Sequence, residues 1–527
     1  MIKTDVKVNI DYTFDGVKGA LCRVLPISEN EVKNLFILKK SLKIEDGNVY
    51  YSLSVAAELS SEREEGLLKM KKKVSPCPVY DFSVPERSFS SRPVVVGAGP
   101  AGLFAALTLA LSGANPIVIE RGRSVEERII SKNVFFENKI LDEESNVQFG
   151  EGGAGAFSDG KLKVGSMDKY KHFVLSSFVE AGAPEDILYT VGAHLGTDKL
   201  PLLVSSIRGK IKALGGEFIY SARVYDIEKK NGKLCAVLYR KDGKDEKIET
   251  DTCVLAAGHS AKDTFEMLLS HGVPMQRRGF GIGVRIEHPR EYVNELVYKE
   301  KTLADKVGTA SYHLVTHLPT GRSVYSFCMC PGGTVVAAAS EGGGVVTNGM
   351  SEYLRMDENS NAAFLVSVTP ADFESDSLLA GIELQRKIER LAYGVGGGDF
   401  TAPAIRMEDF MKKANEPSIR GSVKPTYPCG VCAASVEKYM PDFITDSLRA
   451  GISDFDDWMR GFYYPDAILT GAETRSTSPI RVIRNENYMC PTLEGLYPIG
   501  EGAGYAGGIV SSATDGVRVA ESIILNN

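Results

Sequence analysis

The 527-residue sequence lacks the features that would direct a protein into a membrane or out of the cell. No run approaches the roughly 20 consecutive apolar residues of a membrane span. The first five residues are polar and charged, without the apolar stretch of a secretory signal. Its nine cysteines are an odd number without the framework of a small disulfide-rich scaffold, which favours a reducing compartment. We therefore expect a cytoplasmic protein with no membrane span.

An excess of positive charge is also missing. The formal net charge is −7 at pH 7, which argues against a dominant nucleic-acid surface, so nucleic acid is not the expected partner. One basic cluster, residues 69–73, follows the acidic residues 62–65 and predicts a solvated helix end. Since 43% of the residues are hydrophobic, the chain has enough apolar material for the two or three domains that its length predicts.

Cys429 and Cys432 have the spacing of a redox pair, but they follow Tyr427-Pro428 in a predicted loop with no strand before and no helix after them. We interpret them as incidental thiols rather than a working dithiol. The close pairs in the sequence do not supply four zinc ligands, so no metal site is expected.

The strongest pattern in the sequence lies in residues 93–122. Residues 94–96 are a β-branched run, and the following Gly-x-Gly-x-x-Gly turn leads into a predicted helix and a second strand at 117–119. In such a turn the first glycine allows a sharp bend, the second lets a pyrophosphate approach, and the third lets the helix pack on the strand. An acidic residue at the end of the second strand can bond ribose hydroxyls. The candidate dinucleotide-binding residues are Gly97, Ala98, Gly99, Pro100, Ala101, Gly102, Glu120 and Arg121.

A second glycine-rich segment follows at residues 150–160. Its glycines leave room for a flat ring or a phosphate, and two neighbouring side chains can donate hydrogen bonds. The candidates are Gly152, Gly153, Ser158 and Lys161. The alternative interpretation is a flexible surface loop.

Three later segments complete the pattern. A strand near residue 224 is expected to pass an adenine, and residues 233–240 and 247–250 are predicted to form a hairpin. The apolar strand at 252–258 ends in small residues that let it run against a cofactor. Near the end of the chain a Gly-Glu turn precedes a predicted helix over 509–525, whose N-terminal N–H groups favour an anionic ring edge. The candidates are Val224, Ala257, Gly258, Glu501, Gly507, Gly508 and Ile509.

The same patterns predict the domain organisation. Residues 1–75 form a small α+β unit with strands at 6–12 and 47–59 and a capped helix at 28–39. Residues 76–92 form a proline- and serine-rich linker. The dinucleotide domain occupies 93–275 and returns at 486–527. The insertion at 276–485 is where a substrate domain is expected.

Three segments together, the GxGxxGxxxA turn with Glu120, the strand end at Ala257-Gly258 and the C-terminal Gly-Glu turn, resemble FAD-binding domains of the glutathione-reductase superfamily. The chain is also similar to the bacterial "FAD-dependent protein" family, also called NAD(FAD)-utilising dehydrogenases. This similarity rests on GEGGAG at 150–155, SDGKL at 158–162, GHSA at 258–261, NGMS at 348–351, ETRS at 473–476 and GEGAGYAGGI at 500–509.

The resemblance spans nearly the whole chain and implies an α/β fold. It comprises a Rossmann-like FAD-binding domain of ββα type, an inserted α+β substrate domain and the small N-terminal α+β domain. It implies FAD as cofactor, with Gly97, Gly99, Gly102 and Glu120 on the ADP half. On the flavin half it implies Glu501, Gly507, Gly508 and Ile509. The chain departs from the family pattern at Lys262 and at Cys429-Gly430.

No second complete GxGxxG follows a strand, and no CxxxxC pair lies beside the first, which argues against flavin-disulfide chemistry. We expect an FAD-dependent oxidoreductase that transfers a hydride between flavin and a small anionic substrate, with NAD(P)H as a candidate donor. Candidates for gripping or protonating the substrate are Arg285, His288, Arg475 and Arg481. The alternative is that they form interdomain ion pairs and a histidine whose hydrogen bonds are satisfied within the protein.

Two other functions stay open at this point. One is a flavin-containing nucleic-acid-binding or RNA-modifying protein, suggested by the N-terminal unit and residues 69–73. The other is a binding module in which FAD is structural. The sequence singles out no catalytic acid or base.

Overall fold

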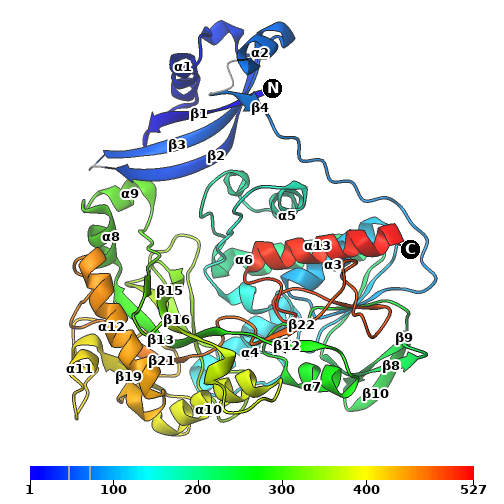
Figure 1. Ribbon diagram of the computed structural model, residues 1–527, viewed down its shortest axis with the longest axis vertical. Coiled ribbons are helices and arrows are strands. Elements are labelled where there is room, and N and C mark those ends of the chain that lie inside the picture. The colour runs from blue at the N-terminus through cyan, green and yellow to red at the C-terminus, as the bar shows by residue number, and fades with distance from the viewer. Residues whose placement is uncertain (46–47, 70–72, 527) are drawn as a thin grey trace.

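The computed structural model describes residues 1–45, 48–69 and 73–526. A small N-terminal unit stands above two larger domains, and an extended segment leads from it down to the first of them (Figure 1). No helix within these described ranges is long and apolar enough to cross a membrane. The first domain contains both an early segment and the last segment of the chain. The C-terminal helix of the chain therefore lies beside the first helix of this domain.

The N-terminal unit has the order βαββαβ. Its elements are β1 (Ile2–Asn9), α1 (Phe14–Val24), β2 (Asn34–Glu45), β3 (Asn48–Glu58), α2 (Ser61–Leu68) and β4 (Ser75–Pro76). They form an antiparallel sheet of order β2-β3-β1-β4, the arrangement of a split β-α-β unit. Alternate residues of β1, such as Val6 and Val8, are buried under the helices.

The helix predicted at 28–39 is wrong. The capping box of Ser28 and Glu31 does form, but it starts only the 3-10 turn Glu29–Glu31. The apolar residues that follow are drawn into β2, where Phe36 pairs with Ala56 and Leu35 is buried in the core of the unit. Long-range strand pairing thus outweighs the local helix signal. The basic cluster at 69–73 lies largely outside the described residues, because 70–72 are not among them.

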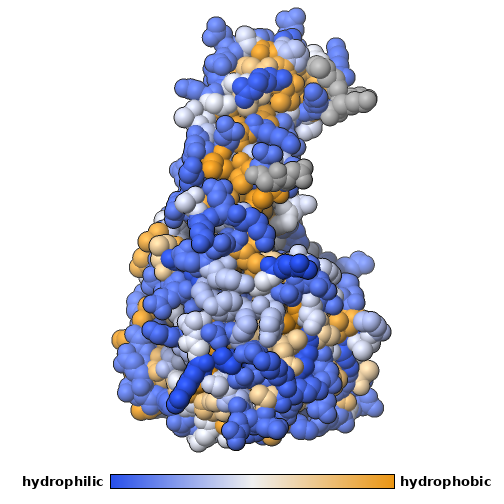
Figure 2. Space-filling view, turned by 90° about the vertical axis from the view of Figure 1, so that its left-hand side faces the viewer, coloured by the Kyte–Doolittle hydropathy of each residue, from blue (hydrophilic) through white to orange (hydrophobic). Residues whose placement is uncertain are grey.

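The N-terminal unit contacts both larger domains. The backbone of Lys40 in β2 exchanges hydrogen bonds of 2.7 and 2.9 Å with Tyr189 and Val191 of the first domain. Ile10, Leu42 and Val49 pack against the apolar core of the second domain. Figure 2 shows apolar residues reaching down the N-terminal unit toward its junction with the body.

The first domain is built on a parallel sheet of order β23-β11-β5-β6-β7. Its strands are β5 (Val94–Val96), β6 (Ile117–Ile119), β7 (Glu217–Ile219), β11 (Cys253–Leu255) and β23 (Leu496–Pro498). The first predicted strand, β5, lies at the centre of the sheet and is buried on both faces. The return of the chain through β23 completes this Rossmann-like α/β sheet.

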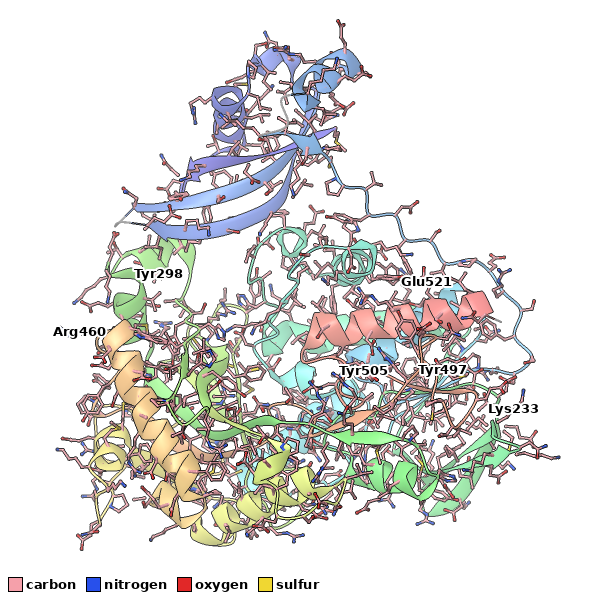
Figure 3. All side chains as sticks on the ribbon, viewed as in Figure 1. Lys233, Tyr298, Arg460, Tyr497, Tyr505 and Glu521 are labelled. Atoms are coloured by element: carbon pink, nitrogen blue, oxygen red, sulfur yellow. The ribbon has the colours of Figure 1, made fainter. Side chains whose placement is uncertain are left out.

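Helices cover the sheet. They are α3 (Pro100–Leu111), α4 (Val125–Asn138), α5 (Lys169–Glu180), α6 (Gly196–Ala213), α7 (Lys262–Ser270) and α13 (Ile509–Asn526). The predicted hairpin forms within an antiparallel sheet of β8 (Ala222–Lys230), β9 (Lys233–Lys241) and β10 (Lys244–Glu249). Glu521 of α13, labelled in Figure 3, accepts hydrogen bonds from Lys169 and Tyr170 of α5 at 2.8 and 2.6 Å. These contacts hold the C-terminal helix in place.

The second domain is built on a seven-stranded sheet of order β14-β15-β18-β13-β21-β19-β20. Its strands are β13 (Phe280–Pro289), β14 (Val315–His317), β15 (Ser323–Cys330), β18 (Asn359–Val368), β19 (Ala402–Arg406), β20 (Val431–Ala433) and β21 (Ile468–Glu473). Its helices are α8 (Arg290–Tyr298), α9 (Leu303–Val307), α10 (Ala380–Val395), α11 (Met407–Met411) and α12 (Asp442–Trp458). The central strand β13 is buried on both faces.

Two small ribbons complete the second half of the chain. One consists of β12 (Met275–Arg277) and β22 (Ile480–Val482), which carry the chain into and out of the insertion. The other consists of β16 (Thr334–Ala337) and β17 (Thr347–Met350). The domain boundaries at 76, 93, 276 and 486 stay a prediction.

Candidate functional site

A large cleft lies between the glycine-rich turns of the first domain and one wall of the second domain. Most of the residues that sequence analysis singled out line it: Gly97, Gly99, Pro100, Ala101, Glu120, Arg121, Gly153, Ser158, Lys161, Val224, Ala257, Gly258, Glu501, Gly507, Gly508 and Ile509. Three predicted residues, Ala98, Gly102 and Gly152, do not line the cleft. The fold therefore gathers segments that are more than 400 residues apart around one cleft.

The three glycines of the first turn have different physical roles. Gly97 has φ +98°, and a Cβ atom there would lie 2.5 Å from the Ala256 carbonyl oxygen. A Cβ atom on Gly102 would lie 1.9 Å from the Gly97 carbonyl oxygen, so this glycine is needed for α3 to pack. A Cβ atom on Gly99 would meet only the Cα of Gly153, at 3.7 Å. The protein itself therefore leaves space open at Gly99, where α3 begins without a side-chain cap.

Glu120 joins the segments at this end of the cleft. Its Oε2 accepts a hydrogen bond of 2.7 Å from the Ala98 N–H, and its Oε1 accepts bonds from Gly122 and Gly150 at 2.9 and 3.1 Å. Oε2 accepts only one of these bonds and so has a lone pair for a further donor, and the side chain lines the cleft. Glu120 is thus fixed in position with capacity left for a sugar hydroxyl.

Arg121 follows Glu120 in the chain, and its side chain is fixed by ion pairs. Its guanidinium donates to Glu144 and Asp263 at 2.7 and 3.1 Å. It also lies 4.1 Å from the centre of the Phe149 ring. This flat, cationic surface and Val224 form the end of the cleft where the adenine was expected.

Arg128, which sequence analysis did not identify, fixes the glycine-rich segment 150–160 through hydrogen bonds to backbone carbonyls. The fully buried guanidinium donates to the carbonyls of Asn146 and Val147 at 2.7 Å, and also to those of Glu151 and Gly153 at 2.8 Å. Burial lowers the pKa of Arg128 to about 10. The interpretation of this segment as a flexible surface loop is wrong. No local signal identifies Arg128, because an arginine in a polar helix has the same pattern when exposed.

The opposite end of the cleft is formed by the Gly-Glu turn before α13. Gly500 donates to Asp515 at 2.8 Å, and Asp515 is paired with Arg484 at 2.7 Å. The Arg484 guanidinium also lies 3.7 Å from the centre of the ring of Tyr505, which Figure 3 labels close to α13. These contacts fix the turn that carries Glu501.

His259 faces Glu501 and has an unused polar atom. Its Nδ1 lies 3.1 Å from Glu501 Oε1, while its buried Nε2 has no hydrogen-bond partner within the described part of the protein. Both side chains line the cleft. Because a buried polar atom without a partner is costly, a ligand atom with complementary polarity is expected beside it.

The second domain supplies the wall that faces this end. The lining residues include Phe327, Cys328 and Cys330 from β15, Asn348 and Gly349 from β17, and Glu473, Arg475 and Ser476 at the end of β21. A bulge shifts the register of β15 between Phe327 and Cys330, and Cys328 has φ +39°. Such bulges redirect side chains at functional sites. The exposed thiol of Cys328 reaches the cleft in this way.

The arginines proposed to grip a substrate have protein partners. Arg285 does not line the cleft; it is fully buried and donates to Glu473 at 2.9 and 2.6 Å. Arg475 lines the cleft but donates to the buried Glu389 at 2.9 and 2.8 Å. Arg481 donates to the Gly504 carbonyl at 3.3 and 3.1 Å. Arg285 and Arg475 therefore form ion pairs as the alternative predicted, but both pairs lie within the second domain and not between domains.

His288 lies away from the cleft, among aromatic rings of the second domain. Its Nε2 is 3.0 Å from the Phe462 carbonyl oxygen. Burial lowers the pKa of His288 to about 4, so the ring is neutral at physiological pH. It is a buried structural histidine, but only one of its ring nitrogens is satisfied, because Nδ1 has no hydrogen-bond partner among the described residues.

Cys429 and Cys432 also lie outside the cleft lining. Both are free thiols, and their sulfur atoms face the carbonyls of Phe135 and Val395, each at 3.6 Å. Burial raises the pKa of Cys429 to about 12 and also raises the pKa of Cys432. These values disfavour the thiolate that redox exchange needs.

Comparisons with known proteins agree with this architecture. Residues 279–476 match the family described as "FAD-dependent protein, C-terminal domain-like", and residues 91–283 match the pyridine nucleotide-disulphide oxidoreductase family. An uncharacterized protein of Clostridium beijerinckii is 43% identical over 529 residues, covering 99% of this chain and 98% of that protein.

Solved structures show much lower similarity. The flavin-dependent brominase Bmp2 has 11% identity and a TM-score of 0.39, with 83% of this chain and 80% of that chain covered. CmlS, a flavin-dependent halogenase, has 12% identity and a TM-score of 0.40, with 84% and 60% covered. At these scores the likeness carries no inference about this chain.

The parallel sheet and its glycine turns form an α/β fold, and the two family matches assign the chain to the FAD-dependent oxidoreductase class. The chain belongs to the bacterial family of FAD-dependent proteins, whose C-terminal domain it carries at residues 279–476.

Proposed function

We propose that the protein is an FAD-dependent oxidoreductase that holds FAD along the cleft. The ADP half would lie on the first turn and Glu120, and the flavin half beside Glu501, Gly507, Gly508 and Ile509. The observation that carries this proposal is the continuous cleft joining the GxGxxG turn at the start of α3 to the Gly-Glu turn before α13. Bound FAD would supply hydride transfer to or from a substrate.

The residues present fit the cofactor. Gly99 leaves open space beside an uncapped helix N-terminus, which suits a pyrophosphate. His259 Nε2 is a buried polar atom that lacks a protein partner within the described residues. Gly507 and Gly508 would place no side chain between a ring and the start of α13. Together these features account for the glycines that the fold itself does not require.

The substrate would enter between the flavin end and the second-domain wall formed by β15, β17 and the end of β21. We propose NAD(P)H as the electron donor. The chain has nine free cysteines, which fits the proposed cytoplasmic location.

Anaerobic titration of the flavin-loaded protein with NADH and then NADPH tests the donor. We expect one of the two to bleach the flavin absorption stoichiometrically, and dithionite to bleach it fully as the control. Complete bleaching by dithionite with no response to either nicotinamide would contradict NAD(P)H as donor and favour a substrate donor or a structural flavin.

The N-terminal sheet does not favour the nucleic-acid alternative. Modules that bind RNA on an open four-stranded sheet stack bases on aromatic side chains of the central strands. On the face away from the helices, β1 carries Lys3, Asp5 and Lys7. The neighbouring central strand β3 carries one aromatic residue on this face, Tyr50, and the Lys7 ammonium covers it, 4.6 Å from the centre of its ring. We therefore keep the oxidoreductase as the proposed function.

A further inference from the structure

Lys161 brings a positive charge to the cleft that no carboxylate neutralises. Its Nζ donates to the Met329 carbonyl of β15, a neutral acceptor. The carboxylate of Asp159, two residues away, is occupied by Arg355 at 2.9 and 2.6 Å. No ion pair of Lys161 occurs in the described ranges 1–45, 48–69 and 73–526. Lys161 therefore differs from the paired arginines around it.

The surroundings of Lys161 make this charge costly. The cleft walls partly bury the Lys161 side chain, and this burial lowers its pKa. An ammonium group has three N–H donors, of which the Met329 carbonyl takes one. A buried cation is stabilised when an anion supplies the missing charge and acceptors. The free donors thus indicate a negatively charged ligand group.

The residues around Lys161 indicate the chemical character of that ligand. Phe327 and Met329 provide apolar and aromatic surface next to Lys161, and both line the cleft. Lys163 also lines it, with Nζ 5.7 Å from the centre of the Phe327 ring. The unpaired donors here are lysines rather than the forked guanidinium of an arginine, because Arg285, Arg355 and Arg475 are all paired.

We propose that Lys161 binds the carboxylate of the substrate, and that Phe327 packs against an apolar, planar body of that substrate. This deepens the proposed function, on which it rests, by naming the substrate class as small carboxylates with an apolar ring or chain. It also moves Lys161 from the cofactor, where sequence analysis placed it, to the substrate.

Calorimetric titration with benzoate tests the proposal, because benzoate has a planar apolar ring and one carboxylate. We expect the FAD-loaded protein to bind benzoate. Lys161→Met should weaken that binding about 10- to 100-fold, the range for loss of a charged hydrogen bond. Lys161→Arg keeps the charge and should retain most of the binding, which guards against a folding defect in the first variant.

Lys132→Met is the matched control. Burial also lowers the pKa of Lys132, but its ammonium lies over the rings of Phe136 and Phe157 and the residue does not line the cleft. We expect this variant to bind benzoate as the wild type does.

A second readout separates the substrate from the cofactor. The FAD content and FAD affinity of Lys161→Met, measured without benzoate, should equal those of the wild type. A lowered FAD content or FAD affinity would overturn the proposal, because Lys161 would then hold the cofactor. Failure of the wild type to bind benzoate, or unweakened binding by Lys161→Met, would overturn it as well.

Calorimetry needs no flavin signal, so the two proposals can fail separately. If the protein takes up no FAD, the proposed function is contradicted. Lys161-dependent benzoate binding to that flavin-free protein would still support a carboxylate site, and absence of such binding would overturn it.

Discussion

Replacing Gly99 with valine should remove FAD from the protein and leave the fold intact. Gly99 has φ −74°, which valine can adopt, and a Cβ atom there has no protein neighbour closer than 3.7 Å. The new methyl groups would instead fill the space where a pyrophosphate approaches the start of α3. We expect FAD to bind at least about 100-fold more weakly, which corresponds to about 3 kcal/mol. Fluorescence titration of the flavin-free protein measures this affinity.

Two further variants serve as controls for Gly99→Val. Gly209→Ala in α6 introduces a Cβ atom into open space and should leave FAD affinity unchanged. Gly102→Ala places a Cβ atom 1.9 Å from the Gly97 oxygen and should disrupt the fold itself. The thermal midpoint of flavin-free Gly99→Val should stay near that of the wild type, since losing a favoured helix cap costs about 1 kcal/mol. Unchanged FAD affinity in Gly99→Val would contradict the placement of the pyrophosphate.

Changing Glu473 to glutamine should strongly destabilise the second domain. Glu473 accepts two hydrogen bonds from the fully buried Arg285, which joins β13 to β21. The amide would leave the guanidinium buried without a countercharge. Breaking such a pair costs about 3–5 kcal/mol in the free energy of unfolding. Calorimetric melting of the flavin-free protein should show a lowered midpoint for this variant.

An exposed ion pair provides the control for Glu473. Glu494 bonds Lys233 at 2.8 Å, and more than half of each side chain's surface is exposed. Glu494→Gln should therefore change the free energy of unfolding by less than about 1 kcal/mol. If Glu473→Gln melted like the wild type, the buried pair of Arg285 and Glu473 would not be what stabilises the second domain.

The local patterns of the first domain were predictable from the sequence. The run at 94–96, the glycine turn and Glu120 are close together in the chain. Their structural roles depend on local sequence and not on contacts with distant segments. The strand and helix at the C-terminus were predictable for the same reason. The hairpin of β9 and β10 was also confirmed.

The second-domain wall could not be predicted in this way. The bulge at Cys328 depends on how β15 pairs with β18, and the pairing of Arg285 with Glu473 joins residues far apart in the sequence. Arg128 is similar, because its role depends on a loop that folds over it. At residues 28–39 the sequence predicted too much from a local signal. The helix cap forms, but the residues after it pair as a strand instead of continuing the helix.

The most direct test of the account is the visible absorption spectrum of the purified full-length protein, with identification of the cofactor released by acid. We predict a flavin spectrum and release of one FAD, not FMN, per chain. A protein that is colourless as purified and does not take up FAD on reconstitution would contradict the assignment of the cleft as an FAD site.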